Sequence, residues 1–109
     1  MTAQYRLSIA ANGQHYFNLT AENNEIVLTS EMYVSKASAQ VGVESVRANG
    51  PMPERYERRE SADGKAYFVL KAANGEVVGT SEMYNSTAAM ENGIEAVMRV
   101  AAGSQLVEV

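Results

Sequence analysis

The sequence predicts an α+β fold in which two tandem β-β-β-α-β repeats form a single antiparallel sheet, with both helices on one face and exchanged C-terminal strands. Three observations lead to this fold class. The chain repeats its own sequence once, each copy contains segments in which apolar and polar residues alternate, and each copy then continues into apolar residues at helical spacing.

The repeat is clearest in the segment 74–86, which echoes 23–35 and contains Thr-Ser-Glu-Met-Tyr in both copies. Residue 74 corresponds to residue 23, so the offset between the copies is 51 residues. A unit of about 50 residues would struggle to bury a sufficient core by itself. We therefore expect one domain over residues 1–109, made of two packed repeats at 5–54 and 55–109.

The first hairpin of each copy turns at a glycine, at residues 11–13 in the first copy. A two-residue loop would place Leu7 opposite a polar residue. A three-residue loop with the glycine in the left-handed conformation instead places Leu7 opposite Phe17 and Tyr5 opposite Leu19. Because a slip of one residue moves every side chain to the other face, the apolar pattern favours the three-residue loop.

The second hairpin turns at residues 23–24, and at 74–75 in the second copy, where a two-residue primed turn is expected. This register predicts one buried and one open face, as is usual for antiparallel sheets. The predicted core face carries Phe17, Leu19, Ala21, Ile26 and Leu28, with Phe68, Leu70, Ala72, Val77, Gly79 and Ser81 in the second copy. The predicted open face includes Tyr16, Val27, Thr29 and Glu31, and their counterparts Tyr67, Val78, Thr80 and Glu82.

Helices are expected at about 35–49 and 86–101, with Ser35 and Ser86 as N-caps and glycines near their C-terminal ends. One flank of each helix carries small residues, and a glycine inside a helix costs about 1 kcal/mol relative to alanine. We therefore expect a close contact with the other helix or with the sheet along this stripe. Its members are Ser38, Gly42, Ser45, Ala89, Gly93 and Ala96.

The segment 53–60 between the copies has charges of both signs, which is typical of a solvated strand. The tail 105–109 corresponds to the start of that segment, so it is expected to be a strand as well. We expect it to pair with an edge of the first repeat.

The composition is that of an ordinary globular protein, with 46% hydrophobic and 20% charged residues. The net charge of −4 argues against a protein that binds nucleic acid by neutralising phosphates. Without cysteine there is no disulfide framework, thiolate zinc site or thiol nucleophile. No signal peptide and no membrane-spanning apolar run is recognised, so we expect a cytoplasmic protein without membrane partners.

The turn segments 21–25 and 71–76, each leading into Thr-Ser-Glu-Met-Tyr, resemble the YegP-like family, as do Tyr67-Phe68-Val69-Leu70 and Asn92-Gly93-Ile94-Glu95. These are small bacterial proteins, often of two repeats, catalogued as a domain of unknown function. The resemblance covers nearly the whole chain and implies one sheet with strands exchanged between units. The first copy departs from the family pattern at Asn24 and His15. The family supplies no established activity, cofactor or catalytic residue.

Candidate sites are few. His15 is the single histidine and a metal site needs several ligands, so it is interpreted as a surface residue. Glu31 and Glu82 could form an acid/base pair, but a position at a strand end facing water is the favoured interpretation of both. Met32, Met83 and Met90 are expected to fill gaps in the core.

The favoured hypothesis is a non-enzymatic interaction module that uses the open sheet face, with no cofactor and an unknown protein or small ligand as partner. Its tentative binding residues are identical in the two copies: Tyr16, Thr29, Glu31, Tyr67, Thr80 and Glu82. The alternative is a small-ligand binder or enzyme using Glu31, Glu82, Tyr33 and Tyr84. A cleft lined by Glu and Tyr would favour the alternative. We expect a monomer with pseudo-dimeric repeats, with a weak homodimer as the other option.

Overall fold

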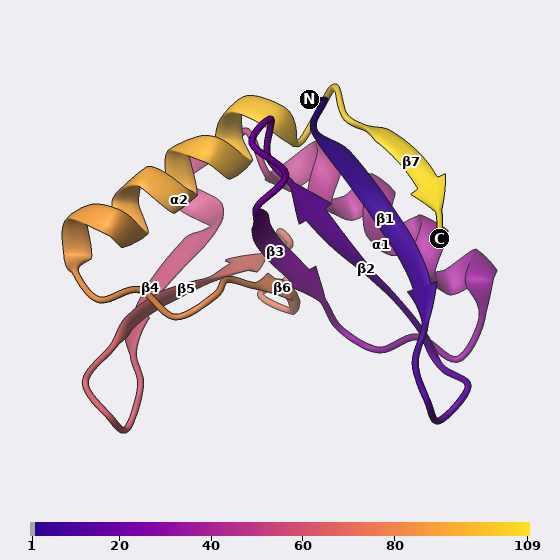
Figure 1. The fold of residues 1–109 in the computed structure, drawn as a ribbon, viewed down its shortest axis with the longest axis horizontal. Helices are drawn as coiled ribbons and strands as arrows, with labels where there is room; N and C mark the ends of the chain where they lie inside the picture. Colours follow the sequence, from indigo (N-terminus) through magenta and orange to yellow (C-terminus); the bar gives the residue numbers. More distant parts are fainter. Residues whose placement is uncertain (1) are drawn as a thin grey trace.

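The computed structural model describes residues 2–109 and contains one seven-stranded sheet and two α-helices (Figure 1). In chain order the elements are β1 (Gln4–Ile9), β2 (His15–Thr20), β3 (Ile26–Ser30), α1 (Lys36–Asn49), the 3-10 helix η1 (Pro53–Arg55), β4 (Tyr56–Glu60), β5 (Ala66–Lys71), β6 (Val77–Thr80), α2 (Thr87–Val100) and β7 (Gln105–Glu108). The predicted α+β class and both helix positions are confirmed.

The strands follow the order β4-β5-β6-β3-β2-β1-β7, so the two repeats meet at the antiparallel pair β3–β6. Thr29 lies directly opposite Thr80, its counterpart in the other repeat, and a pseudo-twofold axis therefore passes between them. Figure 1 shows β1, β2, β3 and β7 as one half of the sheet and β4, β5 and β6 as the other. Both helices pack on the same face, α1 across β2, β5 and β6, and α2 across β3 and β5.

The tail forms β7 and pairs with β1, the edge strand of the first repeat, as predicted. This exchange occurs once, because the corresponding segment of the first repeat is η1 and the start of β4. The pairing of β7 with β1 is parallel, so the expectation of a wholly antiparallel sheet is wrong at this one ladder. The ladders from β6 to β1 are all antiparallel, so β7, which is parallel to β1, runs opposite to β6.

The first hairpin has the predicted three-residue loop. Gly13 has a φ of 85°, Leu7 pairs with Phe17, and Tyr5 pairs with Leu19. All four side chains lie in the core, as do Tyr56, Phe68 and Leu70, the counterparts of Tyr5, Phe17 and Leu19. The counterpart of Leu7 is the exposed Arg58.

The second hairpin differs from the predicted primed turn. Both types of primed turn need a positive φ at the first central residue, here Asn23, but of the two turn residues only Asn24 has one, at 68°. The register shifts beyond Leu19, and this bulge turns Val27 inward beside Leu28. Ile26, predicted to be in the core, is therefore 40% exposed, whereas Val27 is 7% exposed. The same correction moves Val78 from the open face to the core.

The helices begin as predicted, because Ser35 and Ser86 accept hydrogen bonds from backbone N–H groups of the first turn. Their ends differ. Gly50 keeps a right-handed φ of −55°, so it is not a left-handed terminator. A Cβ atom there would overlap Ala101, its counterpart after α2, so the helix ends approach closely. The Tyr5 hydroxyl donates to the Ala101 carbonyl (2.5 Å), and the Tyr56 hydroxyl donates to the Gly50 carbonyl (2.7 Å).

The small-residue stripe is in close contact, but its partner is an aromatic ring rather than the other helix or a backbone. A Cβ atom on Gly93 would lie 2.8 Å from Cζ of Tyr84, and one on Gly42 would lie 2.6 Å from Cζ of Tyr33. Each tyrosine follows the last hairpin strand of its own repeat and stacks on a core phenylalanine. The glycines thus leave room for the two tyrosines.

Candidate functional site

The site of interest lies where the two halves of the sheet separate. Strands β3 and β6 pair only at Thr29–Thr80 and Ser30–Gly79. Just after β6, the side chain of Ser81 takes the place of a backbone acceptor for strand β5. Its Oγ accepts from the Phe68 N–H (2.9 Å) and donates to the Glu82 carbonyl (2.8 Å). An isolated bridge then forms between Tyr84 and Ala66. Residues 82 and 83 therefore leave the ladder and project into solvent.

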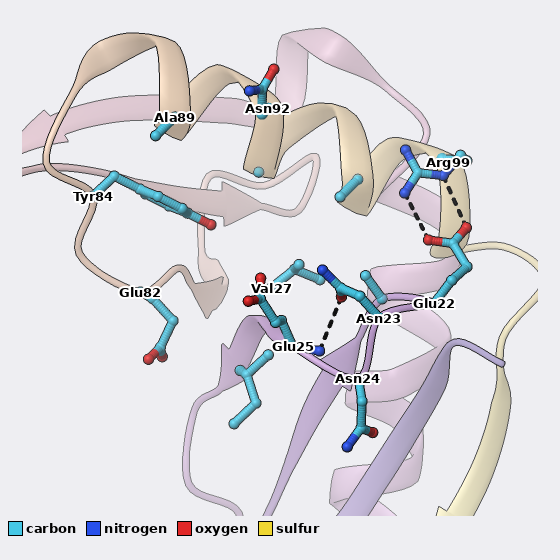
Figure 2. A pocket seen from close by; sticks show the side chains of 14 residues that line it. Glu22, Asn23, Asn24, Glu25, Val27, Glu82, Tyr84, Ala89, Asn92 and Arg99 are labelled. Carbon is cyan, nitrogen blue, oxygen red and sulfur yellow. Dashed lines mark hydrogen bonds and ion pairs between the residues drawn. The ribbon is translucent and has the colours of Figure 1, made fainter. Parts of the chain in front are cut away.

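A groove of about 810 Å³ opens at this separation, between the turn from β2 to β3 and helix α2 (Figure 2). It joins the two repeats, because the turn belongs to the first and α2 to the second. Its lining residues are Ala21, Glu22, Asn23, Asn24, Glu25, Ile26, Val27, Glu82, Tyr84, Ala89, Asn92, Gly93, Ala96 and Arg99. A volume of this size is typical of small-molecule sites.

The wall of the groove is made by Tyr84 and the small residues of α2. Tyr84 is half-buried and stacks on Phe68, with ring centroids 6.5 Å apart. Figure 2 shows its hydroxyl directed into the groove below α2. Burial, together with the nearby carboxylates of Glu82 and Glu25, raises the pKa of this hydroxyl. Tyr84 is therefore a protonated, neutral group near pH 7.

An ion pair closes one end of the groove. The Arg99 guanidinium donates to both carboxylate oxygens of Glu22, at 3.0 and 2.8 Å. These hydrogen bonds lower the pKa of Glu22 to about 2. The turn beside the pair is held by Asn23, whose side chain accepts from the Glu25 N–H (3.1 Å). The end of the groove is thus built from both repeats.

The remaining charge in the groove is negative. Three glutamates and one arginine line it, which gives a formal charge of −2. Within residues 2–109, neither Glu25 nor Glu82 has a basic side chain in ion-pairing range. Such a lining attracts cationic groups and repels anions.

The residues predicted for the open face do not gather into one cluster. Thr29 and Thr80 lie side by side at the pseudo-twofold axis, and the Asn18 amide donates to the Thr29 hydroxyl (2.9 Å). Tyr16 and Tyr67 are half-buried, opposite Ser8 and Arg59 of the outer strands.

The two predicted glutamates are both exposed but belong to different surroundings. Glu82 lines the groove with Tyr84, whereas Glu31 is not among the lining residues and lies near Tyr33. Burial and the negative charge of Glu31 raise the pKa of the Tyr33 hydroxyl. The alternative grouping of Glu31, Glu82, Tyr33 and Tyr84 is therefore divided into two equivalent halves, and the groove contains one of them.

His15 is half-buried at the start of β2, where its backbone forms a bridge with Tyr33. Across residues 2–109 no group of three or more histidine or acidic side chains is placed to hold a metal ion. Among the methionines, Met90 is in the core as predicted, but Met32 and Met83 are 52% and 49% exposed. They are exposed because both lie in the segments that leave the ladder.

Sequence reasoning missed Glu22, Glu25, Asn92 and Arg99. The available signal was the small-residue stripe, which marked the wall of the groove but was interpreted only as a packing contact. The turn residues gave no signal of their own, since Asx-type turns are ordinary surface features.

Fold and site together define a two-repeat α+β protein with a groove at the junction of its repeats. A family model described as a domain of unknown function (DUF1508) matches residues 10–57 and again 61–108. The chain is 50% identical over 95 residues to the UPF0339 protein YegP of Yersinia pestis, covering 87% of this chain and 85% of that one. A UPF0339 protein of Shewanella oneidensis is 49% identical over 98 residues, covering 90% and 89%.

Two solution NMR structures have the same fold. A UPF0339 protein of Shewanella oneidensis has a TM-score of 0.91 and 44% identity, covering 99% of this chain and 92% of that one. The yegP protein of Escherichia coli, titled a protein of unknown function, has a TM-score of 0.92 and 42% identity, covering 99% and 93%. The chain belongs to this YegP-like (UPF0339, DUF1508) family, whose function is unknown. Over residues 2–109 no helix is long and apolar enough to cross a membrane.

Proposed function

We propose that the protein is a non-enzymatic binding module that holds a small ligand in the groove between the β2–β3 turn and α2. The groove itself carries this proposal, because it brings Glu82 and Tyr84 together with Glu25 around a space of about 810 Å³. The two repeats already provide each other with the strand pairing that a single repeat would seek in a second copy. This supports a monomer as the binding unit.

The lining supports binding more than catalysis. Its titratable groups are glutamates, one arginine and Tyr84. The arginine is held by Glu22, and the pKa of Tyr84 is raised away from neutrality, which makes the hydroxyl a poor general acid or base at pH 7. Neither histidine nor serine lines the groove, so no activated nucleophile can be assembled from its lining.

A groove-filling substitution tests the proposal. Tagged protein is recovered from a cytoplasmic extract, the compartment that the sequence predicts, and retained small molecules are identified by native mass spectrometry. The parent should retain a small molecule, and Ala96→Phe should lose it because the ring occupies the groove. Ser45→Phe, at the equivalent position of α1, is the matched control and should retain it. Unchanged retention by Ala96→Phe, or no ligand on the parent, would contradict the proposal.

A second candidate function is recognition of a protein partner by the open sheet face. It is favoured by the placement of Thr29 against Thr80 at the repeat junction and by the exposure of Glu31 and Glu82, which have no basic side chain in pairing range within residues 2–109. Tyr16 and Tyr67 complete this proposed surface. Core packing does not require the two repeats to have the same residues at these positions.

Replacing Glu31 and Glu82 together with glutamine should abolish retention of a protein partner in a low-salt pull-down, where charge steering is strongest. Stability should change by no more than about 0.5 kcal/mol, because both side chains are solvated. The control replaces Glu44 and Glu95, another repeated pair on the helices, with glutamine and should leave retention of the protein partner unchanged. Full retention by the first variant would remove the two carboxylates from the binding surface.

A further inference from the structure

The groove has two chemically different regions. One is an apolar strip formed by the small residues of α2 and by the first residues of β3, namely Ala89, Gly93, Ala96, Ile26 and Val27. The other is a polar end where Glu25, Glu82 and the Tyr84 hydroxyl provide oxygen atoms. Figure 2 shows the Glu25 carboxylate and the Tyr84 hydroxyl facing each other from opposite sides of the groove, whereas the Glu82 side chain extends away from both.

The polar end has no protein cation of its own. Arg99 is the single basic residue of the lining, and Glu22 engages its guanidinium through two hydrogen bonds. Glu25 and Glu82 therefore lack a compensating charge from the described residues 2–109. An ammonium group would supply this charge, with hydrogen bonds to the Glu25 carboxylate and the Tyr84 hydroxyl and charge attraction to Glu82.

We propose that the groove binds a linear alkylamine, with its ammonium group between the Glu25 carboxylate and the Tyr84 hydroxyl and with Glu82 as a nearby second negative charge. The alkyl chain then lies along the apolar strip beside Ala89, Ala96 and Ile26, since the Tyr84 ring fills the space at Gly93. This inference rests on the proposed small-ligand function and names the class of ligand. Charge complementarity selects an amine over an anion, and the apolar strip selects an alkyl chain over a bare metal cation.

The site is specific to the α2 side of the molecule. The equivalent surface near α1 keeps the carboxylates Glu76 and Glu31 and the aromatic Tyr33. However, Ala73 and Ala48 stand where the α2 side has Glu22 and Arg99, so the ion pair that closes the groove has no counterpart there. Val41 likewise replaces Asn92. The two repeats have therefore diverged at the end of the groove that the ion pair closes.

The test uses spermidine as the probe, and its binding is monitored through amide chemical shifts in two-dimensional NMR spectra at low salt. Saturable shifts should appear at the β2–β3 turn and at Gly93. Glu25→Gln with Glu82→Gln should weaken binding by about tenfold or more, since it removes both unpaired carboxylates. Glu31→Gln with Glu76→Gln removes the same charge from the equivalent surface and should change affinity by less than about twofold.

Three results would overturn the inference. The first is the absence of saturable shifts with spermidine, and the second is equal weakening by the two double variants, which would indicate unspecific attraction to an acidic protein. The third is tighter binding of an acetylated trilysine peptide than of spermidine, which would assign the groove to a protein partner. If an extract ligand is retained but spermidine does not bind, the small-ligand function stands and the amine assignment fails.

Discussion

Replacing Gly93 with leucine should lower the free energy of unfolding by about 1–3 kcal/mol or more, as overpacking of a filled core does. The added side chain would overlap the Tyr84 ring, because even its Cβ atom would lie 2.8 Å from Cζ of Tyr84 and 3.3 Å from Cε2 of Phe68. Tyr84 cannot turn away easily, since it stacks on Phe68 and its backbone pairs with Ala66.

Urea unfolding of four variants would measure this effect. Gly93→Ala should cost less, because the gain in helix propensity of about 1 kcal/mol offsets part of the steric strain. Gly42→Leu, against Tyr33, should reproduce the loss on the other helix. Gly103→Leu is the matched control, since no atom lies within 4 Å of a Cβ there. A Gly93→Leu protein as stable as its parent would show that the tyrosine contact is not tight.

Deletion of residues 105–109 should destabilise the protein and cause it to aggregate. Strand β7 covers the edge of β1 through four residue pairs, and Val109 adds a hydrogen bond to the Leu7 carbonyl (2.9 Å). Each lost hydrogen bond contributes about 0.5–1.5 kcal/mol net, and Leu106 also packs against the core. The exposed edge of β1 would then be a template for pairing with other chains.

Light scattering after size-exclusion chromatography, with urea unfolding, tests the deletion. Removal of Val109 alone is the control, because it loses one hydrogen bond but keeps the four β7–β1 residue pairs and should keep the parent's oligomeric state. A 105–109 deletion that matched the parent in both measurements would make β7 dispensable.

The fold was predictable because the repeat, the strand pattern and the helix signals all agreed. The first hairpin shows how specific such evidence can be: one glycine and the pairing of Leu7 with Phe17 determined its register. The second hairpin shows where it fails. Asn24 fits either a primed turn or a single left-handed position, and only the bulge beyond Leu19 distinguishes them. The sequence does not indicate the bulge, because Ile26, Val27 and Leu28 are all apolar and either register places apolar residues in the core.

Much less of the candidate site could be predicted. The importance of Glu82 and Tyr84 was visible because both are repeated, but the groove depends on where strands β3 and β6 separate. That separation is a tertiary feature set by two residue pairs, and it brings Glu25 near Tyr84 from the other repeat. Arg99 was equally hidden, since nothing in the sequence near α2 indicates that Glu22 lies beside it.

The contact between Leu28 and Gly79 bears on how a duplicated chain differs from a dimer of single repeats. These residues are counterparts in the two repeats, and a Cβ atom on Gly79 would lie 2.6 Å from Cδ2 of Leu28. In a symmetric dimer the same residue must stand on both sides of the axis, so two leucines would compete for one space and two glycines would leave it empty. Once both repeats are encoded in one chain, one copy can supply the knob and the other the hole. Covalent duplication thus allows the centre of the molecule to be filled in a way that identical subunits cannot achieve.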